Sequence, residues 1–483
     1  MSSHRPMHRA LPLSLFVAAL GAVLSAQPVF RGHEIFPPEE FAARRARVFE
    51  GIDDGVAVLQ GTTERGGEEP LRQSNQFFYL TGIVEPRALV LLDGRTRKTT
   101  VFLQPADARR DDRMFGPALA PGDEAARLTG VDAVHPREDF RRVAGTLAGR
   151  TVYTPFRTEV LGSQSSGDPS TLARNTAGDP WDGRRSREEV FRDKLKAAVP
   201  GAELRDLDPM LDAMRAVKSP REIALIREAT RLTGLGVMEA MRDARPSMAE
   251  YELQAAAEFV FTRGGAFGPA YFALVATGTN TYYSHYHRNT AVLADGDLVQ
   301  FDYAPDYKYY QSDVTRVFPA NGRFTARQRE FYTIYLQLYR AVMTSIAVHA
   351  TPADVVRNAV AKMDGIVAAF PFTDAAIKEA AVRFVEAYRT RTKVRGLGHD
   401  VGMEVHDVTG PQSATLEPGR VFTIEPAMRI EAERLSIRLE DMILITDTGY
   451  ENLSAFVPIE IEDIERLMAQ PGLSDAALQL PPR

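Results

Sequence analysis

Two pairs of acidic residues lie at corresponding places in two segments that each have the pattern of a β-hairpin. In the first segment, residues 295–319, two apolar runs flank the turn sequence PDYK. A turn centred between Tyr307 and Lys308 places Asp302 directly opposite Asp313, on the same face of the strand pair. We therefore expect these two carboxylates to lie side by side.

The second segment, residues 420–446, repeats the arrangement. A turn centred at Ala432 and Glu433 places Glu425 opposite Glu440. A single histidine, His399, lies between the two segments in the glycine-rich sequence GLGHDVG. The spacing thus predicts two facing carboxylate pairs and one imidazole between them.

Four carboxylates embedded in β-branched and aromatic sequence repel one another unless something neutralises them. Two divalent cations balance four negative charges, and this set of hard oxygen ligands with one imidazole suits manganese, with zinc or cobalt as alternatives. Each residue taken alone is more commonly a turn residue or a surface charge, but unrelated surface charges rarely form two pairs in register. The predicted metal ligands are Asp302, Asp313, His399, Glu425 and Glu440.

The stretches FDYAPDYKYYQSDVTRVFP, GLGHDVGMEVHDV, FTIEP and IRLED resemble the metal-binding motifs of the pita-bread metallopeptidases, in particular the aminopeptidase P and prolidase group. The resemblance covers most of residues 215–465. It implies that Asp313 and Glu440 bridge both metals, that Asp302 binds one of them, and that His399 and Glu425 bind the other. It also implies a metal-bridging hydroxide as the nucleophile.

Further catalytic residues are implied by the same resemblance. His285, with His287 close enough to be confused with it, corresponds to a histidine that contacts substrate. His406 corresponds to a histidine that donates a hydrogen bond to the substrate carbonyl or the tetrahedral intermediate. Glu425 is a candidate to carry the proton to the leaving nitrogen. Surface positions remain the alternative for these histidines.

Arg438 precedes the last predicted ligand by two residues, so strand alternation places it on the same face. There it is expected to hold the bridging carboxylates by a bidentate pair, although an exposed strand cation is the alternative. The chain also departs from the family pattern at Arg395, Asp400, Ala427 and Arg429. None of these is a predicted ligand, so the departures concern the shape of the proline pocket.

The N-terminal half resembles the smaller creatinase-type domain of the same group, through the stretch LRQSNQFFYLTGIVEPRALVLLD. Residues 37–52 have helical periodicity. Short apolar runs at 55–61, 75–84, 88–94 and 99–105 are typical of a mixed sheet flanked by helices. Residues 161–187 form a Ser-, Gly-, Asp- and Pro-rich insertion with the only tryptophan, Trp181, and we expect a mobile surface loop there.

Helix starts in the second half carry capping-box signatures, at Ser219 with Glu222, Ser247 with Glu250, and Thr325 with Gln328. The predicted fold is α+β, with a creatinase-type α/β domain over 27–205 and a pita-bread catalytic domain over 206–467, in which outer helices cover a curved, mostly antiparallel sheet. Residues 468–483 form a C-terminal tail.

Composition is that of a globular chain of 483 residues, with 44% apolar and 25% charged residues. A net charge of −6 gives no indication of nucleic-acid binding. The first 26 residues have a basic start, an apolar run and a small-residue cleavage site, so they predict a signal peptide. The chain has no cysteine. We expect a periplasmic or secreted protein without stable membrane insertion once the signal is removed.

The function predicted from these features is removal of the N-terminal residue from peptides with proline at the second position. The alternative is an Xaa-Pro dipeptidase, which requires a cation such as Arg395 or Arg429 for the substrate's terminal carboxylate. A metal-free binding protein or a creatinase-like hydrolase is less favoured, because neither needs four buried carboxylates. The family implies a homo-oligomer, either a dimer or a tetramer.

Overall fold

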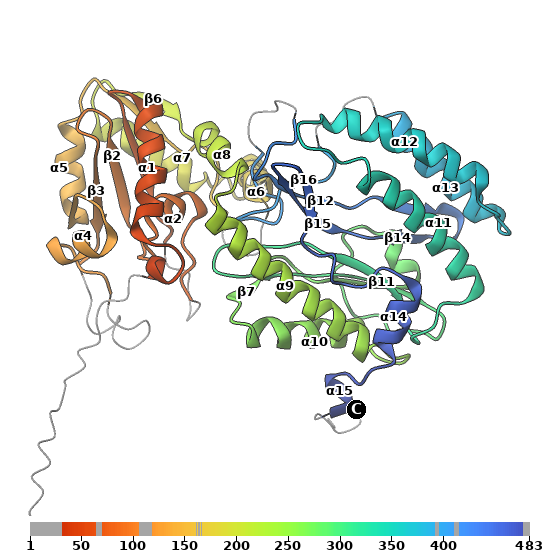
Figure 1. Ribbon diagram of the computed structural model, residues 1–483. Coiled ribbons are helices and arrows are strands. Elements are labelled where there is room, and N and C mark those ends of the chain that lie inside the picture. The colour runs from red at the N-terminus through yellow and green to blue at the C-terminus, as the bar shows by residue number, and fades with distance from the viewer. Residues whose placement is uncertain are drawn as a thin grey trace, which may run out of the picture.

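The computed structural model describes residues 31–63, 70–105, 118–160, 162, 165, 167–391, 396–409 and 415–476. Two domains lie side by side, the N-terminal one in red to yellow and the C-terminal one in green to blue (Figure 1). The predicted signal peptide and Arg395 fall outside the described residues. No described helix is long and apolar enough to cross a membrane.

The N-terminal domain is built on a six-stranded sheet in the order β4-β3-β2-β1-β5-β6. β1 pairs antiparallel with β2, and β2 with β3, whereas the remaining pairs are parallel, so the expected mixed sheet is confirmed. The strands are β1 (Val56–Gln60), β2 (Leu89–Asp93), β3 (Lys98–Leu103), β4 (Ala133–Pro136), β5 (Thr151–Thr154) and β6 (Glu203–Asp206).

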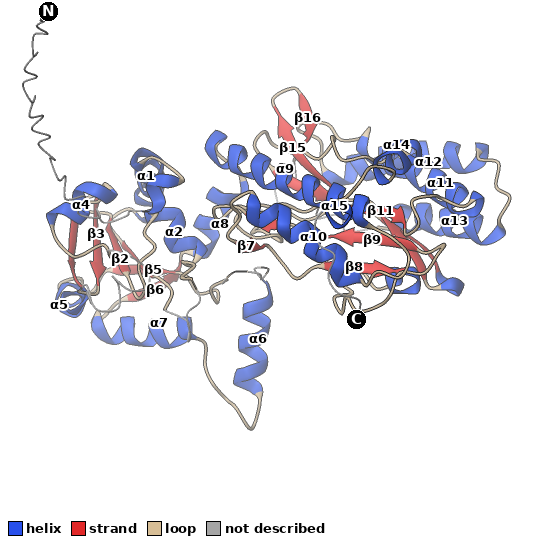
Figure 2. Ribbon diagram, turned by 90° about the horizontal axis from the view of Figure 1, so that it is seen from below, coloured by secondary structure: helices blue, strands red, loops and turns tan. Residues whose placement is uncertain are grey.

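Helices cover both faces of this sheet (Figure 2). Alternation along β1 shows why: Ala57 and Leu59 join the core under α1 and α2, while Val56 and Val58 join the core under α5 and α7. The helices are α1 (Pro38–Ile52), α2 (Asn75–Thr81), α4 (Asp123–Thr129), α5 (Phe140–Gly145), α6 (Gly167–Gly178), α7 (Arg187–Ala198) and α8 (Asp208–Ala216), with 3-10 turns η1 (Arg31–Glu34) and η2 (Arg137–Asp139).

Two sequence predictions in this domain are wrong. The run at 75–84 was expected to be a strand, but its first seven residues form α2, which is buried on all sides and ends at Gly82 in the left-handed conformation. A short run that is apolar throughout has no hydrophobic periodicity, so the sequence alone cannot distinguish a buried strand from a buried helix. The insertion at 161–187 contains α6 rather than only a loop; α6 projects from the domain (Figure 2), and the Trp181 side chain is 96% exposed.

The C-terminal domain contains antiparallel strands covered by helices, as expected. One sheet has the order β11-β9-β8, a second has the order β12-β15-β16, and two-stranded ladders join β13 to β14 and β10 to β7. The strands are β7 (Gly268–Pro269), β8 (Leu274–Thr277), β9 (Leu298–Asp302), β10 (Pro305–Asp306), β11 (Thr315–Pro319), β12 (Val421–Ile424), β13 (Ala427–Ile430), β14 (Leu435–Arg438), β15 (Asp441–Thr446) and β16 (Gly449–Asn452).

The helices of this domain surround the strands in Figure 1 and bury the largest apolar core against them. They are α9 (Pro220–Asp243), α10 (Glu250–Arg263), α11 (Ala326–Met343), α12 (Pro352–Ala369), α13 (Ala375–Arg389), α14 (Ile461–Met468) and α15 (Leu473–Ala476), with 3-10 turns η3 (Gly278–Tyr282) and η4 (Glu431–Glu433). α15 lies in the segment expected to be a tail.

Capping predictions hold at two of three helices. Ser219 caps α9 and Thr325 caps α11, each in a full capping box. The prediction at Ser247 is wrong, because that residue has a φ of 77° and α10 begins three residues later. The carboxylate of Glu250 accepts backbone hydrogen bonds from Thr277 and Ala291 instead, which ties the start of α10 to neighbouring loops.

The first predicted hairpin forms, but its register differs by two residues. Tyr307 and Tyr310 exchange backbone hydrogen bonds of 2.8 and 3.0 Å around a two-residue turn. Both turn residues, Lys308 and Tyr309, have positive φ, as the tightest hairpin turns require. Tyr309 is 2% exposed and stacks on Phe78 of the N-terminal domain at 3.8 Å, so contact between the domains favours this turn.

As a consequence, Asp302 pairs with Thr315, and Asp313 is a diagonal neighbour rather than the opposite residue. The shift by two residues preserves the face on which each side chain points. The second hairpin has the predicted register: Ile424 pairs with Asp441 and Ala427 with Arg438, so that Glu425 and Glu440 lie opposite each other between these two ladders.

Candidate metal centre

The two hairpins and the segment around His399 bring all five predicted ligands into one buried cluster. Three overlapping groups of side chains each place their ligand atoms within 4.8 Å of one another. The groups are Asp302 with Asp313 and Glu440, His399 with Glu425 and Glu440, and Asp313 with His399 and His406. The sequence prediction that these residues meet is therefore confirmed, while their roles as ligands remain a prediction.

His399 stands at the centre of the cluster. Its Nε2 lies 3.5 Å from Asp313, 3.3 Å from Glu425 and 3.7 Å from Glu440. Its Nδ1 is 3.3 Å from the carbonyl oxygen of Asp400. A metal-binding histidine commonly donates one ring N–H to a carbonyl, which leaves the other nitrogen for the ion. The orientation of His399 fits that arrangement.

Tyr271 joins the first carboxylate pair and was missed from the sequence. Its hydroxyl oxygen lies 2.6 Å from Asp302 Oδ1 and 2.7 Å from Asp313 Oδ1, in a fully buried position. One hydroxyl hydrogen serves only one carboxylate at a time. Tyr271 precedes β8, far from either aspartate in sequence, and no local motif marks it.

Two threonines hold the glutamates and were also not predicted. Thr315 donates a hydrogen bond to Glu440 Oε2 at 2.7 Å, and Thr423 donates to Glu425 Oε1 at 3.2 Å. Thr315 begins β11, whose backbone accepts a hydrogen bond from Glu440, whereas Thr423 lies in β12 two residues before Glu425. Strand alternation was sufficient to place Thr423 on the same face as Glu425 and so to suggest this contact.

Arg438 enters the cluster, but with different partners from those predicted. It donates to Asp302 Oδ2, and its Nη1 lies 3.8 Å from Glu425 Oε2. The expected bidentate pair with the bridging carboxylates does not form. Arg438 pairs with Ala427 at the end of a ladder, which makes Glu425 its diagonal neighbour across the hairpin.

The positive charge within the cluster is smaller than the negative charge. Arg438 and His399 face four carboxylates, and Glu440 Oε1 is a buried oxygen that accepts no hydrogen bond from any described residue. Burial raises the pKa of Asp302 to about 7, and burial together with Asp313 raises that of Glu440 well above its usual value. An uncompensated buried oxygen among carboxylates fits a cation site.

The protonation of the two nearest histidines differs in the metal-free protein. Burial lowers the pKa of His399, but the carboxylates of Asp313 and Glu440 outweigh burial and hold this pKa well above its usual value. Burial, followed by the charge on His399, lowers the pKa of His406. His406 lies 4.0 Å from His399 between ring centroids and is therefore neutral near pH 7.

The structure also separates His285 from His287. His285 lies 6.4 Å from His406 between ring centroids and lines a hollow beside the cluster. The His287 ring packs at a tilt against Phe272, with 4.6 Å between ring centroids, and its Nδ1 lies 3.0 Å from the backbone oxygen of His285. Of the two, His285 is the one that faces the cluster.

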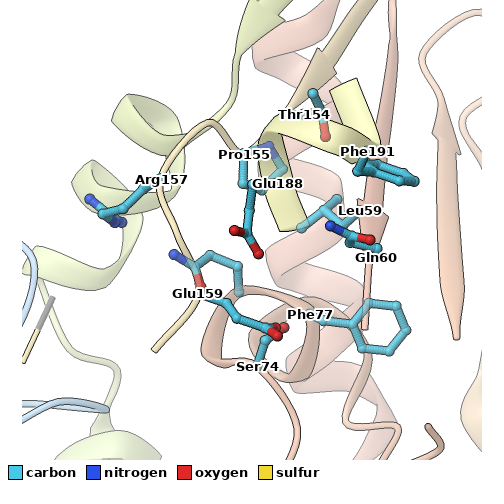
Figure 3. Close-up of a pocket in the computed structure, with 11 residues that line it drawn as sticks. Leu59, Gln60, Ser74, Phe77, Thr154, Pro155, Arg157, Glu159, Glu188 and Phe191 are labelled. Carbon is cyan, nitrogen blue, oxygen red and sulfur yellow. The ribbon is translucent and has the colours of Figure 1, made fainter. Parts of the chain in front are cut away.

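A second polar cavity lies in the N-terminal domain, where Glu188 and Glu159 approach it from opposite sides (Figure 3). Burial raises the pKa of Glu188, and its Oε2 has no hydrogen-bond partner. The volume is about 30 Å³. A cavity of that size is large enough for water but not for a peptide.

Comparison with known proteins agrees with this site. Residues 224–447 match the family described as Metallopeptidase family M24, and residues 41–153 match the Aminopeptidase P, N-terminal domain. The chain is 32% identical to the Xaa-Pro aminopeptidases of Haemophilus influenzae and Escherichia coli, over 89% of this chain and 97% of each relative. It is 27% identical to the human Xaa-Pro dipeptidase.

Solved structures extend the match to the whole two-domain arrangement. Aminopeptidase P from Escherichia coli with the inhibitor Pro-Leu has a TM-score of 0.70 at 30% identity, covering 90% of this chain and 98% of that one. Proline aminopeptidase P II from Yersinia pestis has a TM-score of 0.70 at 31% identity, with 90% and 100% covered. Fold and site define a metallopeptidase with a pita-bread catalytic domain. The chain belongs to the M24 metallopeptidase family and has the aminopeptidase P arrangement of domains.

Proposed function

We propose that this protein is an Xaa-Pro aminopeptidase that uses two divalent metal ions, with manganese as the preferred metal. The observation that carries the proposal is the largely buried cluster of four carboxylates and His399, in which Glu440 Oε1 accepts no hydrogen bond from the described chain. Similarity to Xaa-Pro aminopeptidases over nearly their full length supports the choice of substrate.

The proposed ligands are Asp302, Asp313, His399, Glu425 and Glu440. Bound divalent ions supply Lewis acidity and lower the pKa of water, so that a nucleophile is available near neutral pH. Manganese prefers carboxylate oxygens as ligands, whereas thiolates favour softer metals. The chain has no cysteine that could supply a thiolate. The threonines at 315 and 423 orient the two glutamates.

The chain's own groups handle the protons. The Glu425 side chain is 27% exposed, whereas that of Glu440 is 1% exposed, so Glu425 is the carboxylate that meets substrate and solvent. Glu425 accepts the proton of the attacking water and passes it to the leaving nitrogen. Neutral His406 donates an N–H to the substrate carbonyl oxygen, which gains negative charge in the transition state. His285 lies beyond His406 and contacts the substrate.

Proline at the second position explains why a dedicated enzyme is needed. The bond before proline is a tertiary amide, and its nitrogen carries no hydrogen that a general aminopeptidase could bind.

The test compares Ala-Pro-Ala, Ala-Ala-Ala and Ala-Pro as substrates of the purified protein, with and without added manganese. Manganese-dependent release of alanine from Ala-Pro-Ala alone is expected. Preferential cleavage of Ala-Pro identifies a dipeptidase, and no cleavage of any peptide refutes the proposal.

We also propose that residues 1–26 are a signal peptide, so that the mature protein is periplasmic or secreted, and that it forms a homo-oligomer. The support is the basic, apolar and small-residue order of the first 26 residues, together with the oligomers that the family implies. N-terminal sequencing of exported protein tests the first proposal, with Gln27 expected at the new terminus. Light scattering tests the second, and a monomeric mass contradicts it.

A further inference from the structure

A hollow of about 480 Å³ lies beside the metal centre. Residues 282–285, Arg429 and Glu431 line it, so it begins at His285 and extends away from the cluster. Four of these residues belong to the end of η3 and the loop that follows it, and the other two belong to the second hairpin, where Arg429 lies in β13 and Glu431 in η4. A peptide that places its first bond at the metals therefore has this hollow as a neighbour.

Strand register places Arg429 on the same face as the metal centre. Arg438, which contacts Asp302 and Glu425, pairs with Ala427, and Arg429 lies two residues further along the same strand. Residues that pair directly and residues two apart in a strand share a face, so Arg438, Ala427 and Arg429 lie on one face of the ladder. Met428 and Ile430 lie on the other face and point into the core. At about 3.3 Å per residue, Arg429 lies about 13 Å along the strand from Glu425. An extended peptide covers that distance in about four residues.

Arg429 has no charged partner of its own. Within the described part of the chain its guanidinium makes no hydrogen bond or ion pair, although Glu431 lines the same hollow. The carboxylate of Glu431 instead accepts a hydrogen bond from the Tyr282 hydroxyl at 2.5 Å. Arg434 adds a second positive charge nearby, 5.2 Å over the ring of Tyr283. The hollow thus contains one cation, Arg429, and one anion that is engaged by a tyrosine, while a second cation packs on one of the lining rings.

We propose that Arg429 binds a carboxylate of the peptide substrate and so selects peptides that carry a negative charge a few residues from the cleaved bond. The guanidinium is partly exposed, faces the substrate side of the sheet, and presents a planar donor fork that matches a carboxylate. The carboxylate comes either from the free C-terminus of a short peptide or from an acidic side chain. This inference rests on the proposed Xaa-Pro aminopeptidase activity.

The test uses three substrate pairs that differ only in charge. Ala-Pro-Ala-Ala-Ala against its C-terminal amide probes the free terminus, Ala-Pro-Ala-Glu-Ala-amide against Ala-Pro-Ala-Gln-Ala-amide probes the fourth residue, and Ala-Pro-Ala-Ala-Glu-amide against Ala-Pro-Ala-Ala-Gln-amide probes the fifth. The ratio of kcat/KM within each pair is measured for the wild type and for Arg429→Gln. We expect a ratio of about tenfold to a hundredfold in at least one pair of the wild type, which identifies the source of the carboxylate, and a ratio near one in the variant.

Two further variants separate recognition from structure. Arg429→Lys keeps the charge but not the fork, so part of the preference should return. Arg263→Gln removes a surface cation of α10 outside the hollow and should leave every ratio unchanged. Equal ratios in the wild type and Arg429→Gln, or a wild type without any charge preference, overturn the inference. Cleavage of the uncharged partners continues in either case, whereas failure of the proposed function abolishes cleavage of all six peptides.

Discussion

Two acidic clusters of the catalytic domain differ in their charge balance, and the chain's own cations match the carboxylates in only one of them. At the contact with α8, Glu404 and Asp407 lie beside Arg215 and Lys218, with ion-pair distances of 2.5 to 3.4 Å. Two anions meet two cations. At the metal centre, four carboxylates meet Arg438 and a histidine, and within the described residues Glu440 Oε1 accepts no hydrogen bond.

The difference in charge balance indicates a different role for each acidic cluster. The balanced cluster joins three parts of the molecule, because Asn75 of α2 also donates to Glu404 at 3.0 Å. Its charges cancel within the described residues, although Glu404 Oε2 and Lys218 Nζ also lack a hydrogen bond there. In the unbalanced cluster the carboxylates outnumber the cations, so bound cations are expected to supply the missing charge. The predictions below test this contrast, beginning with the largest effect.

The first prediction concerns the unbalanced cluster. Glu440→Gln removes a predicted bridging carboxylate while preserving size, so kcat/KM should fall at least about 1,000-fold, since metal ions supply several kcal/mol of transition-state stabilisation. Metal content should fall with it. The control is Glu451→Gln in β16, which loses only an exposed pair with Arg227. Retention of full activity in Glu440→Gln contradicts the assignment.

The second prediction concerns the balanced cluster. Arg215→Met leaves Glu404 and Asp407 buried with one cation, so the free energy of unfolding should fall by about 3–5 kcal/mol. Added manganese should restore nothing beyond its effect on the wild type, because this site does not bind it. Urea unfolding measures the change, with Arg227→Met as the exposed control expected to lose at most about 1 kcal/mol. A loss no larger than the control's shows that the cluster is not a structural anchor.

The third prediction concerns the hydroxyl shared by Asp302 and Asp313. Tyr271→Phe keeps the ring but removes that hydroxyl, so metal affinity or kcat/KM should fall about 10- to 100-fold. Titration of the metal-free protein with manganese, followed by assay at saturating metal, separates the two effects. Unchanged affinity and activity show that the hydroxyl does not position these carboxylates.

A smaller effect is expected from pH in the metal-free protein. Burial raises the pKa of Asp302 from 3.8 to about 7, with Asp313 and Glu425 adding to the rise and Arg438 opposing it, while Tyr271 faces the same group. Such a carboxyl stabilises the fold fully below its unfolded pKa and loses that contribution as pH rises towards 7. Stability relative to Asp302→Asn should therefore fall between about pH 4 and 7. Added manganese should reverse that trend, and a rise in the metal-free protein contradicts it.

The sequence predicted which residues meet at the site better than it predicted the register of the first hairpin and the side chains that contact the carboxylates. Ligand types and hairpin faces follow from local alternation, so Glu425 and Glu440 were placed in the correct register. The first hairpin was shifted by two residues because Tyr309 takes a left-handed conformation in packing against Phe78, a contact between domains that no local pattern encodes.

The same reason explains the other errors. Tyr271 reaches the site only through the fold, and the partners of Arg438 depend on which edge of the cluster its long side chain meets. The helix α2 replaced an expected strand because its seven residues are all buried and show no periodicity. Local chemistry was readable from residue types, whereas contacts between distant segments required the structure.

Metal binding by the purified, chelator-treated protein tests the central claim most directly. Isothermal titration with manganese, checked by elemental analysis after desalting, should show two ions per chain and an accompanying rise in the unfolding temperature. The Arg215→Met variant, if folded, should bind the same two ions. Fewer than one ion per chain, with no thermal stabilisation, contradicts the account, because the carboxylates at 302, 313, 425 and 440 would then be buried together without the cations that the charge balance requires.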